Sequence, residues 1–95
     1  MPSLIKSPGQ ISKIRQSSKI LAATLKILEK KAHPGVNLLE LEDVARSHIE
    51  KHGGKPAFLG YRPEGASYKY PAALCTSVND VVVHGIPTDR KLLDG

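Results

Sequence analysis

Proline and glycine residues divide this chain into two helical segments and a longer stretch that is not helical throughout. His33-Pro34-Gly35 and Gly53-Gly54 each interrupt an apolar pattern of helical period. Proline cannot continue a helical hydrogen-bond ladder, and glycine takes the positive φ that commonly ends one. From Pro56 onward, short apolar runs alternate with turn residues. The sequence therefore predicts an α+β chain in which two helices precede a β-hairpin-like segment, with strands between Pro56 and Ile86.

The first helix is predicted to run from Pro8 to Lys31. Ser7 supplies the capping hydroxyl, Pro8 occupies the first helical position, and Gln10 is the returning side chain of a capping box. Apolar residues then recur three or four positions apart, with one interruption, at Ile11, Ile14, Leu21, Leu25 and Leu28. We expect this stripe to face a core while the lysines of the helix face water.

The second helix is predicted to run from Leu38 to His52, after a cap formed by Asn37 and Glu40. Its buried stripe is expected at Leu38, Leu41, Ala45 and Ile49. Its acidic residues are interpreted as a solvated face rather than a paired acid and base; they are Glu40, Glu42, Asp43 and Glu50.

Length and charge limit the chain to one small domain with a basic surface. Its 95 residues carry a formal net charge of +5, and the lysines concentrate in the first helix. A solvated helix face explains that concentration, although an RNA-rich partner surface is an alternative. No aromatic residues interleave with these charges, so no specific nucleic acid is expected as a partner. No apolar run is long enough to predict a membrane span.

Cys75 is the one cysteine of the sequence, which excludes an internal disulfide. A reducing compartment follows naturally, and we expect a cytoplasmic protein. Because Cys75 follows Ala72-Ala-Leu, it is interpreted as a buried and inert thiol.

His48 and His52 lie four residues apart on the second predicted helix. This spacing allows two imidazoles to share a metal. In the zinc-protease pattern a glutamate directly follows the first histidine, whereas here Ile49 does. The sequence favours an exposed pair without a metal.

His84 sits between the run Val81-Val-Val83 and the turn Gly85-Ile-Pro87, which predicts a histidine at a strand end. Phe58, Tyr61 and Tyr70 are the aromatic residues best placed to line a pocket beside it. Residue chemistry alone also fits ordinary core and solvated positions, so these patterns indicate only a small cytosolic α+β domain.

Several segments resemble type I methionine aminopeptidases, and they occur in the order expected for that family. They are Ile5–Pro8, Pro34–Val36, Leu39–Leu41, Pro56–Tyr61 and Cys75–Pro87. The resemblance implies the pita-bread fold, in which two related halves surround a dinuclear metal centre. It implies removal of the initiator methionine when the second residue is small. By this resemblance, residues 1–95 are the N-terminal part of such a domain, and the metal-binding half is absent.

The resemblance also assigns roles to individual residues. His84 matches a histidine that contacts the substrate near the scissile amide. Tyr61 and Tyr70 match residues around the methionine side chain, and Phe58 occupies a neighbouring wall position. The segment Arg62–Lys69 lengthens a connection that is short in many members, so Tyr68 competes with Tyr70 for the pocket role. Asn79 and Val81 match backbone positions that hold a monovalent cation in some members.

The family's divalent metal pair, Co, Mn, Fe or Zn, is held by two aspartates, one histidine and two glutamates. By the resemblance these ligands lie beyond the equivalent of Gly95, so we expect the isolated chain to bind no such pair and to be inactive. The expected partner is the N-terminus of a peptide or nascent chain. A different hypothesis is a stand-alone basic module that docks on ribosomes or nascent chains. An unpaired Val81–Val83 strand predicts self-association or aggregation.

Overall fold

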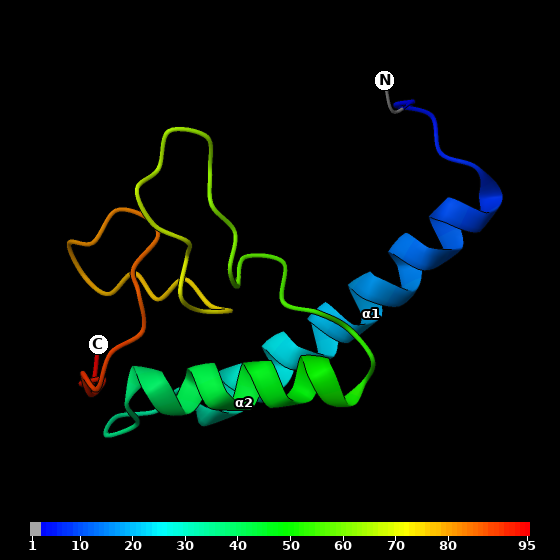
Figure 1. Ribbon diagram of the computed structural model, residues 1–95. Coiled ribbons are helices and arrows are strands. Elements are labelled where there is room, and N and C mark those ends of the chain that lie inside the picture. Colours follow the sequence, from blue (N-terminus) through cyan, green and yellow to red (C-terminus); the bar gives the residue numbers. More distant parts are fainter. Residues whose placement is uncertain (1–2) are drawn as a thin grey trace.

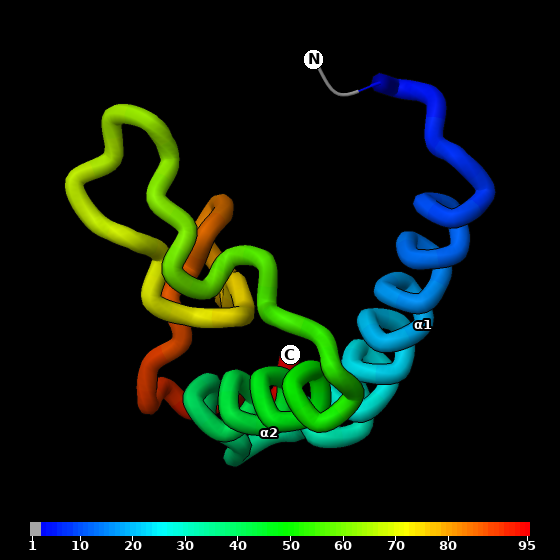
Figure 2. Tube along the Cα trace, turned by 45° about the vertical axis from the view of Figure 1, so that its right-hand side comes forward, coloured from blue at the N-terminus to red at the C-terminus, as the bar shows by residue number. Residues whose placement is uncertain are grey.

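The computed structural model describes residues 3–95 and contains two helices (Figure 1). Helix α1 spans Pro8–Lys31 and helix α2 spans Leu38–Lys51. After α2, the chain runs through turns and loops that gather on one side of that helix (Figure 2). The C-terminal half of α1 packs along α2, while its N-terminal half projects away from the rest of the molecule (Figure 1). No helix in residues 3–95 has the length and apolar character needed to cross a membrane.

Helix α1 begins with the capping box that its sequence predicts. The Gln10 N–H donates to Ser7 Oγ at 3.2 Å, and the Ser7 N–H donates to Gln10 Oε1 at 2.8 Å. Lys30 and Lys31 stand in the last turn, where positive charge complements the helix dipole. The local signals therefore account for both ends of the helix.

The apolar stripe of α1 is largely exposed, and the expectation that it faces a core is wrong for the described residues. Leu21 and Leu25 are 54% and 55% exposed, and Ile11 and Ile14 are exposed as well. Leu28, by contrast, packs against the buried cluster of the molecule. Most of the stripe is thus an apolar face that no described residue covers.

Helix α2 buries the face that its periodicity predicts. Asn37 caps it, because Asn37 Oδ1 accepts a hydrogen bond from the Glu40 N–H at 2.8 Å. The buried residues of its apolar stripe are Leu38, Leu41 and Ala45, whereas Ile49, which was also expected to be buried, is half-buried. The helix ends at Lys51, one residue earlier than predicted, and Gly53 follows with a φ of 81°.

The hydrophobic core is small and lies between the start of α2 and the later loops. Its buried members are Val36, Leu38 and Leu41, and the half-buried side chains packed on them are Leu28, Leu74, Val78 and Leu92. The chain near its end pairs antiparallel with the segment before α2: the Gly35 N–H donates to the Leu92 carbonyl and the Leu92 N–H to the Val36 carbonyl, both at 2.8 Å. The pairing continues through an isolated bridge between Asn37 and Lys91, and the Leu38 N–H donates to the Arg90 carbonyl at 3.1 Å.

The β-hairpin-like segment predicted between Pro56 and Ile86 is not confirmed, since no strand forms in the described residues. Two loops, 61–70 and 76–85, are instead each closed by hydrogen bonds at their bases. A strand requires a ladder of bonds along several residues, and such a ladder is missing here.

Candidate substrate-binding site

Tyr70 joins the two loops of the second half of the chain. Its hydroxyl donates to the Leu74 carbonyl at 2.7 Å, and the Gly85 carbonyl is a second acceptor at 3.2 Å. Its ring packs edge-on against Phe58, with ring centroids 6.2 Å apart and an interplanar angle of 80°. Tyr70 therefore holds the aromatic segment against the residue that follows His84.

The loop 61–70 brings Tyr61 to the same base. The Tyr70 N–H donates to the Tyr61 carbonyl at 2.7 Å, and the Gly60 N–H donates to the Tyr70 carbonyl at 2.8 Å. The side chains of Tyr61 and Tyr68 are both exposed. Tyr70 is thus the tyrosine that contacts Phe58, while no ring contact joins Tyr68 to another described aromatic residue.

Burial raises the pKa of the Tyr70 hydroxyl above its usual value, and the neighbouring Cys75 thiol adds to this shift. The proton that Tyr70 donates to backbone carbonyls is therefore held firmly. Cys75 itself is exposed, so the expectation of a buried thiol is wrong. Ala72 nearby is buried instead, which shows that the apolar stretch turns its small residue, not its cysteine, inward.

The loop 76–85 is closed where Gly85 meets Thr76. The Thr76 N–H donates to the Gly85 carbonyl at 2.7 Å, and the Gly85 N–H donates to Ser77 Oγ at 3.1 Å. A Cβ atom built on Gly85 would overlap the Thr76 carbonyl. Position 85 consequently has no room for any side chain.

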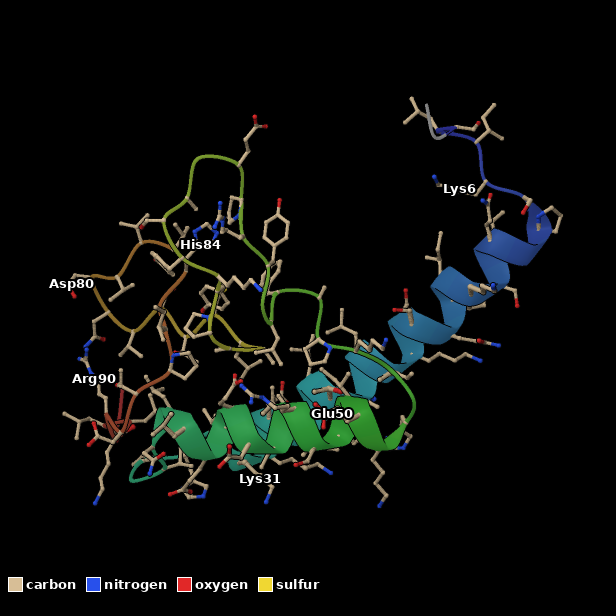
Figure 3. All side chains as sticks on the ribbon, in the orientation of Figure 1. Lys6, Lys31, Glu50, Asp80, His84 and Arg90 are labelled. Carbon is tan, nitrogen blue, oxygen red and sulfur yellow. The ribbon has the colours of Figure 1, made fainter. Side chains whose placement is uncertain are left out.

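His84 stands in this loop, directly before Gly85. The prediction of a strand end is wrong, because His84 has a left-handed backbone with a φ of 55° and no strand precedes it. Its side chain is exposed (Figure 3). A left-handed conformation at a residue other than glycine costs about 1–3 kcal/mol, and such residues cluster at functional sites, although histidine adopts it more readily than most residues.

Glu42 is a part of this region that the sequence interpretation placed wrongly. It is only 4% exposed rather than solvated. Its Oε2 accepts from the Ala73 N–H at 2.7 Å and its Oε1 from the Leu74 N–H at 2.9 Å. Arg46 Nη2 lies 2.8 Å from Oε2 and adds an ion pair. One carboxylate therefore ties α2 to the segment that leads into the site.

The sequence predicts only part of the environment of Glu42. Glu42 and Arg46 are four residues apart, which indicates an ion pair on one helix face. The burial of Glu42 arises from Ala73, 31 residues away, and helical periodicity carries no information about that contact.

Not all the predicted site residues meet in one hollow. Phe58 lines a groove of about 590 Å³ between α1 and the segment after α2, whereas Tyr61, Tyr70 and His84 do not line it. Asn79 and Val81 belong to a turn, with the Val81 N–H donating to the Val78 carbonyl at 3.2 Å and Asn79 at a φ of 55°. The expectation of a monovalent cation there remains a prediction.

The histidines of α2 differ from the sequence interpretation. His52 is exposed, but His48 is half-buried and its Nδ1 lies 2.7 Å from the buried Thr24 Oγ1. Residues 3–95 hold no group of three or more His, Cys, Asp or Glu side chains placed to share a metal ion. The described residues therefore do not fit a dinuclear metal pair.

Comparisons with known proteins give a consistent result. Methionine aminopeptidase from Aquifex aeolicus is 49% identical over 87 residues, which cover 92% of this chain and 34% of that protein. The Helicobacter pylori enzyme is 42% identical over 91 residues, which cover 96% and 34% respectively. The crystal structure of methionine aminopeptidase from Rickettsia prowazekii superposes with a TM-score of 0.85 at 34% identity, over 96% of this chain and 34% of that chain.

The chain spans about a third of the length of the curated relatives it matches. Because these relatives are named as methionine aminopeptidases, they give no support to a stand-alone basic module. The structural match supports the pita-bread architecture for the arrangement of α1, α2 and the following loops. Residues 12–95 match the profile of metallopeptidase family M24, and the chain belongs to that family.

Proposed function

We propose that residues 1–95 are the N-terminal part of a methionine aminopeptidase domain and supply its substrate-binding residues. The observation that carries this proposal is the hydrogen bond from the Tyr70 hydroxyl to the Gly85 carbonyl, because it joins the aromatic segment to the neighbour of His84. The relatives named above act as support, since their similarity covers nearly the whole chain. The substrate is the N-terminus of a peptide or nascent chain in the cytoplasm, and its initiator methionine is removed.

Phe58, Tyr61 and Tyr70 are assigned to the walls around the methionine side chain. A thioether makes favourable contacts with aromatic edges, so this wall suits methionine. Phe58 and Tyr61 keep about half of their surfaces free for such a contact. Tyr70, rather than Tyr68, is assigned because its ring packs against Phe58 and its hydroxyl is committed to backbone acceptors.

His84 is assigned to the reacting end of the substrate. An imidazole that is held in place can donate a hydrogen bond to the carbonyl oxygen of the scissile amide, where negative charge develops. The left-handed backbone at His84 supports a constrained role. Asn79 and Val81 are proposed as backbone positions for a monovalent cation.

A divalent metal is expected in the complete enzyme, because family M24 consists of metallopeptidases. We propose a pair of Co, Mn, Fe or Zn ions, which would supply an activated water. The residues of 3–95 do not fit such a pair, and no metal-dependent step is assigned to them.

A chimera tests the proposal. Residues 1–95 replace the matching segment of the Aquifex aeolicus methionine aminopeptidase, and methionine release from a Met-Ala-Ser peptide is measured with Co²⁺ or Mn²⁺. We expect release, and we expect His84→Ala to lower kcat/KM by about 10²- to 10³-fold. His33→Ala, on the turn after α1, is the matched control and leaves kcat/KM unchanged.

The possible outcomes test the proposed function and the assignment of His84 separately. A folded chimera that releases no methionine contradicts the proposed function. A chimera whose activity survives His84→Ala retains the function and contradicts the assignment of His84. The isolated 95-residue chain is expected to release no methionine with added Co²⁺, Mn²⁺ or Fe²⁺, and an enzyme-like rate there would overturn that expectation.

A further inference from the structure

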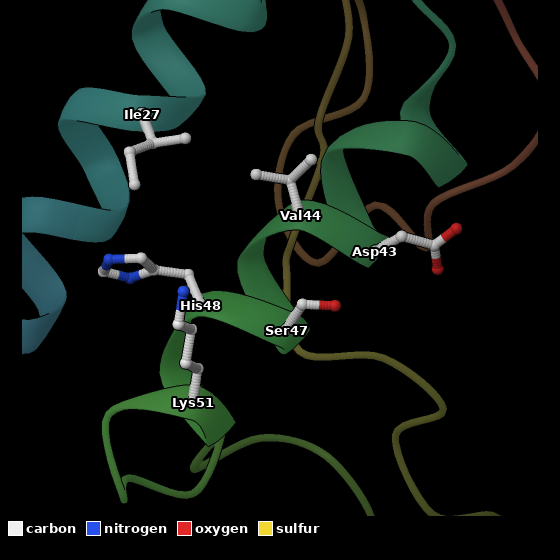
Figure 4. Close-up of a pocket in the computed structure, with 6 residues that line it drawn as sticks. All are labelled: Ile27, Asp43, Val44, Ser47, His48 and Lys51. Carbon is white, nitrogen blue, oxygen red and sulfur yellow. The ribbon is translucent and has the colours of Figure 1, made fainter.

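Two histidines at the C-terminal end of α2 lie close together, with tilted rings, outside the candidate site. His48 and His52 are one helical turn apart, and their ring centroids are separated by 4.3 Å with an interplanar angle of 39°. His48 points from α2 toward α1, where Ile27 stands opposite (Figure 4). The nitrogen-bearing edges of the two rings are therefore close enough for one ion to be shared at those edges.

The hydrogen bonds of Thr24 determine which nitrogen of His48 carries the proton. Thr24 is 1% exposed, and its Oγ1 lies 2.7 Å from both the Ile20 carbonyl and His48 Nδ1. A carbonyl only accepts, and a threonine hydroxyl has a single hydrogen to donate. That hydrogen goes to Ile20, so His48 Nδ1 must carry a proton and donate to Thr24.

The same reasoning applies to His52. Its Nδ1 lies 2.8 Å from the His48 carbonyl, which can only accept. His52 Nδ1 is therefore also protonated. In the neutral form of each ring, the lone pair belongs to Nε2.

This arrangement is typical of histidines that bind metals. Metal-bound imidazoles usually donate their second nitrogen to a carbonyl, carboxylate or water, which fixes the ring and its tautomer. Here a hydroxyl and a carbonyl accept these two bonds, and both Nε2 lone pairs remain for an ion. The i, i+4 spacing alone favours an ordinary surface pair. The two hydrogen bonds, which leave Nε2 of each ring free, favour a metal site instead.

We propose that His48 and His52 bind one borderline divalent ion, such as Zn²⁺ or Ni²⁺, through their Nε2 atoms. Since residues 3–95 place no third His, Cys, Asp or Glu with this pair, water completes the coordination. By linking the last turn of α2 to the residue that caps it, beside the Thr24 contact, the ion stabilises the packing of α2 on α1.

The surroundings of the pair give water and ions access. His48 lines a hollow of about 380 Å³, together with Asp43 and Lys51 (Figure 4). His52 lines the groove of about 590 Å³ described above. The Lys51 ammonium competes with a bound cation, so a Lys51→Gln variant is expected to bind the ion more tightly.

Calorimetric titration of the 95-residue chain with Zn²⁺ and with Ni²⁺ tests the proposal. We expect one ion per chain, with affinity lowered more than tenfold in His48→Gln and in His52→Gln. The matched controls His33→Gln and His84→Gln keep the affinity. Circular dichroism of each variant checks that the helices persist. Added Zn²⁺ should raise the melting temperature of the parent chain and of the two control variants, but not that of His48→Gln or His52→Gln.

Two further measurements separate a metal site from a structural histidine pair. Thr24→Val, which removes the acceptor of His48, is expected to lower affinity by about 10- to 100-fold, and Thr24→Ser to preserve it. Long-range ¹H–¹⁵N spectra of the metal-free chain should show both rings protonated at Nδ1. Nε2-protonated rings, absence of binding, or binding that survives both glutamine variants would each overturn the proposal.

Discussion

At the scale of single residues, Glu42 is the strongest link between α2 and the candidate site. Each of its oxygens accepts a backbone N–H, from Ala73 and from Leu74. Glu42→Gln places an amide NH₂ against one of these donors, and we expect the free energy of unfolding to fall by about 1–3 kcal/mol. Urea denaturation measures this change. Glu50→Gln removes the same charge from an exposed position of α2 and should have little effect.

Tyr70 makes stability depend on alkaline pH. Its pKa is raised in the folded chain, so the folded state holds the proton more firmly than the unfolded state does. The stability that Tyr70 contributes is fully present below about pH 10, which is the pKa of an unperturbed tyrosine. This contribution to stability falls as pH rises further. Denaturation at pH 9 and at pH 11 should show a smaller loss for Tyr70→Phe than for the parent chain. An equal loss in both would contradict this linkage.

Residue-level interpretation succeeded where chemistry is local and failed where burial depends on distant segments. The cap of Ser7 follows from its neighbours alone, and the structure contains it. Glu42 is buried by a segment far along the chain, and the exposure of Cys75 depends on how that segment turns. Neither the burial of Glu42 nor the exposure of Cys75 can be predicted from hydrophobic periodicity in the sequence.

At the scale of elements, the helices were predictable and the strands were not. A helix satisfies its backbone hydrogen bonds within one segment, so caps and periodicity suffice to place α1 and α2. A strand needs a partner segment along several residues. After Pro56 the described backbone pairs only at the bases of its two loops and where residues 88–92 meet residues 35–39, and neither pairing forms a strand. The apolar run Val81–Val83 consequently lies in the irregular loop 76–85, with Val82 88% exposed.

The loop 76–85 depends on its closing glycine. Because a side chain at position 85 overlaps the Thr76 carbonyl, Gly85→Ala must open the loop base. We expect the melting temperature to fall by several degrees, which corresponds to a loss of about 1–3 kcal/mol. Gly9→Ala is the control, since the nearest atom to its added Cβ is Ser7 Oγ at 4.0 Å. Equal melting temperatures for the two variants would show that the loop base tolerates a side chain.

At the scale of the whole molecule, the core is too small for the apolar surface that the chain carries. The buried apolar cluster consists of Val36, Leu38 and Leu41, while the stripe of α1 remains uncovered. Burying a leucine side chain contributes about 1.5–3 kcal/mol, so exposed stripes of this kind favour contact with other chains. The isolated chain therefore exposes apolar surface whose burial against another chain would be favourable.

That exposed apolar surface predicts self-association of the isolated chain. Sedimentation velocity at rising concentration should show a growing average mass, and Leu21→Gln combined with Leu25→Gln should reduce it. Ser12→Gln combined with Ser18→Gln changes exposed polar positions of the same helix and should not. If Val82→Thr removes association and the leucine variant does not, the chains associate through the run Val81–Val83 rather than through α1. A monodisperse monomer with a cooperative melt at high temperature would contradict both, because it would require a core larger than the one these residues bury.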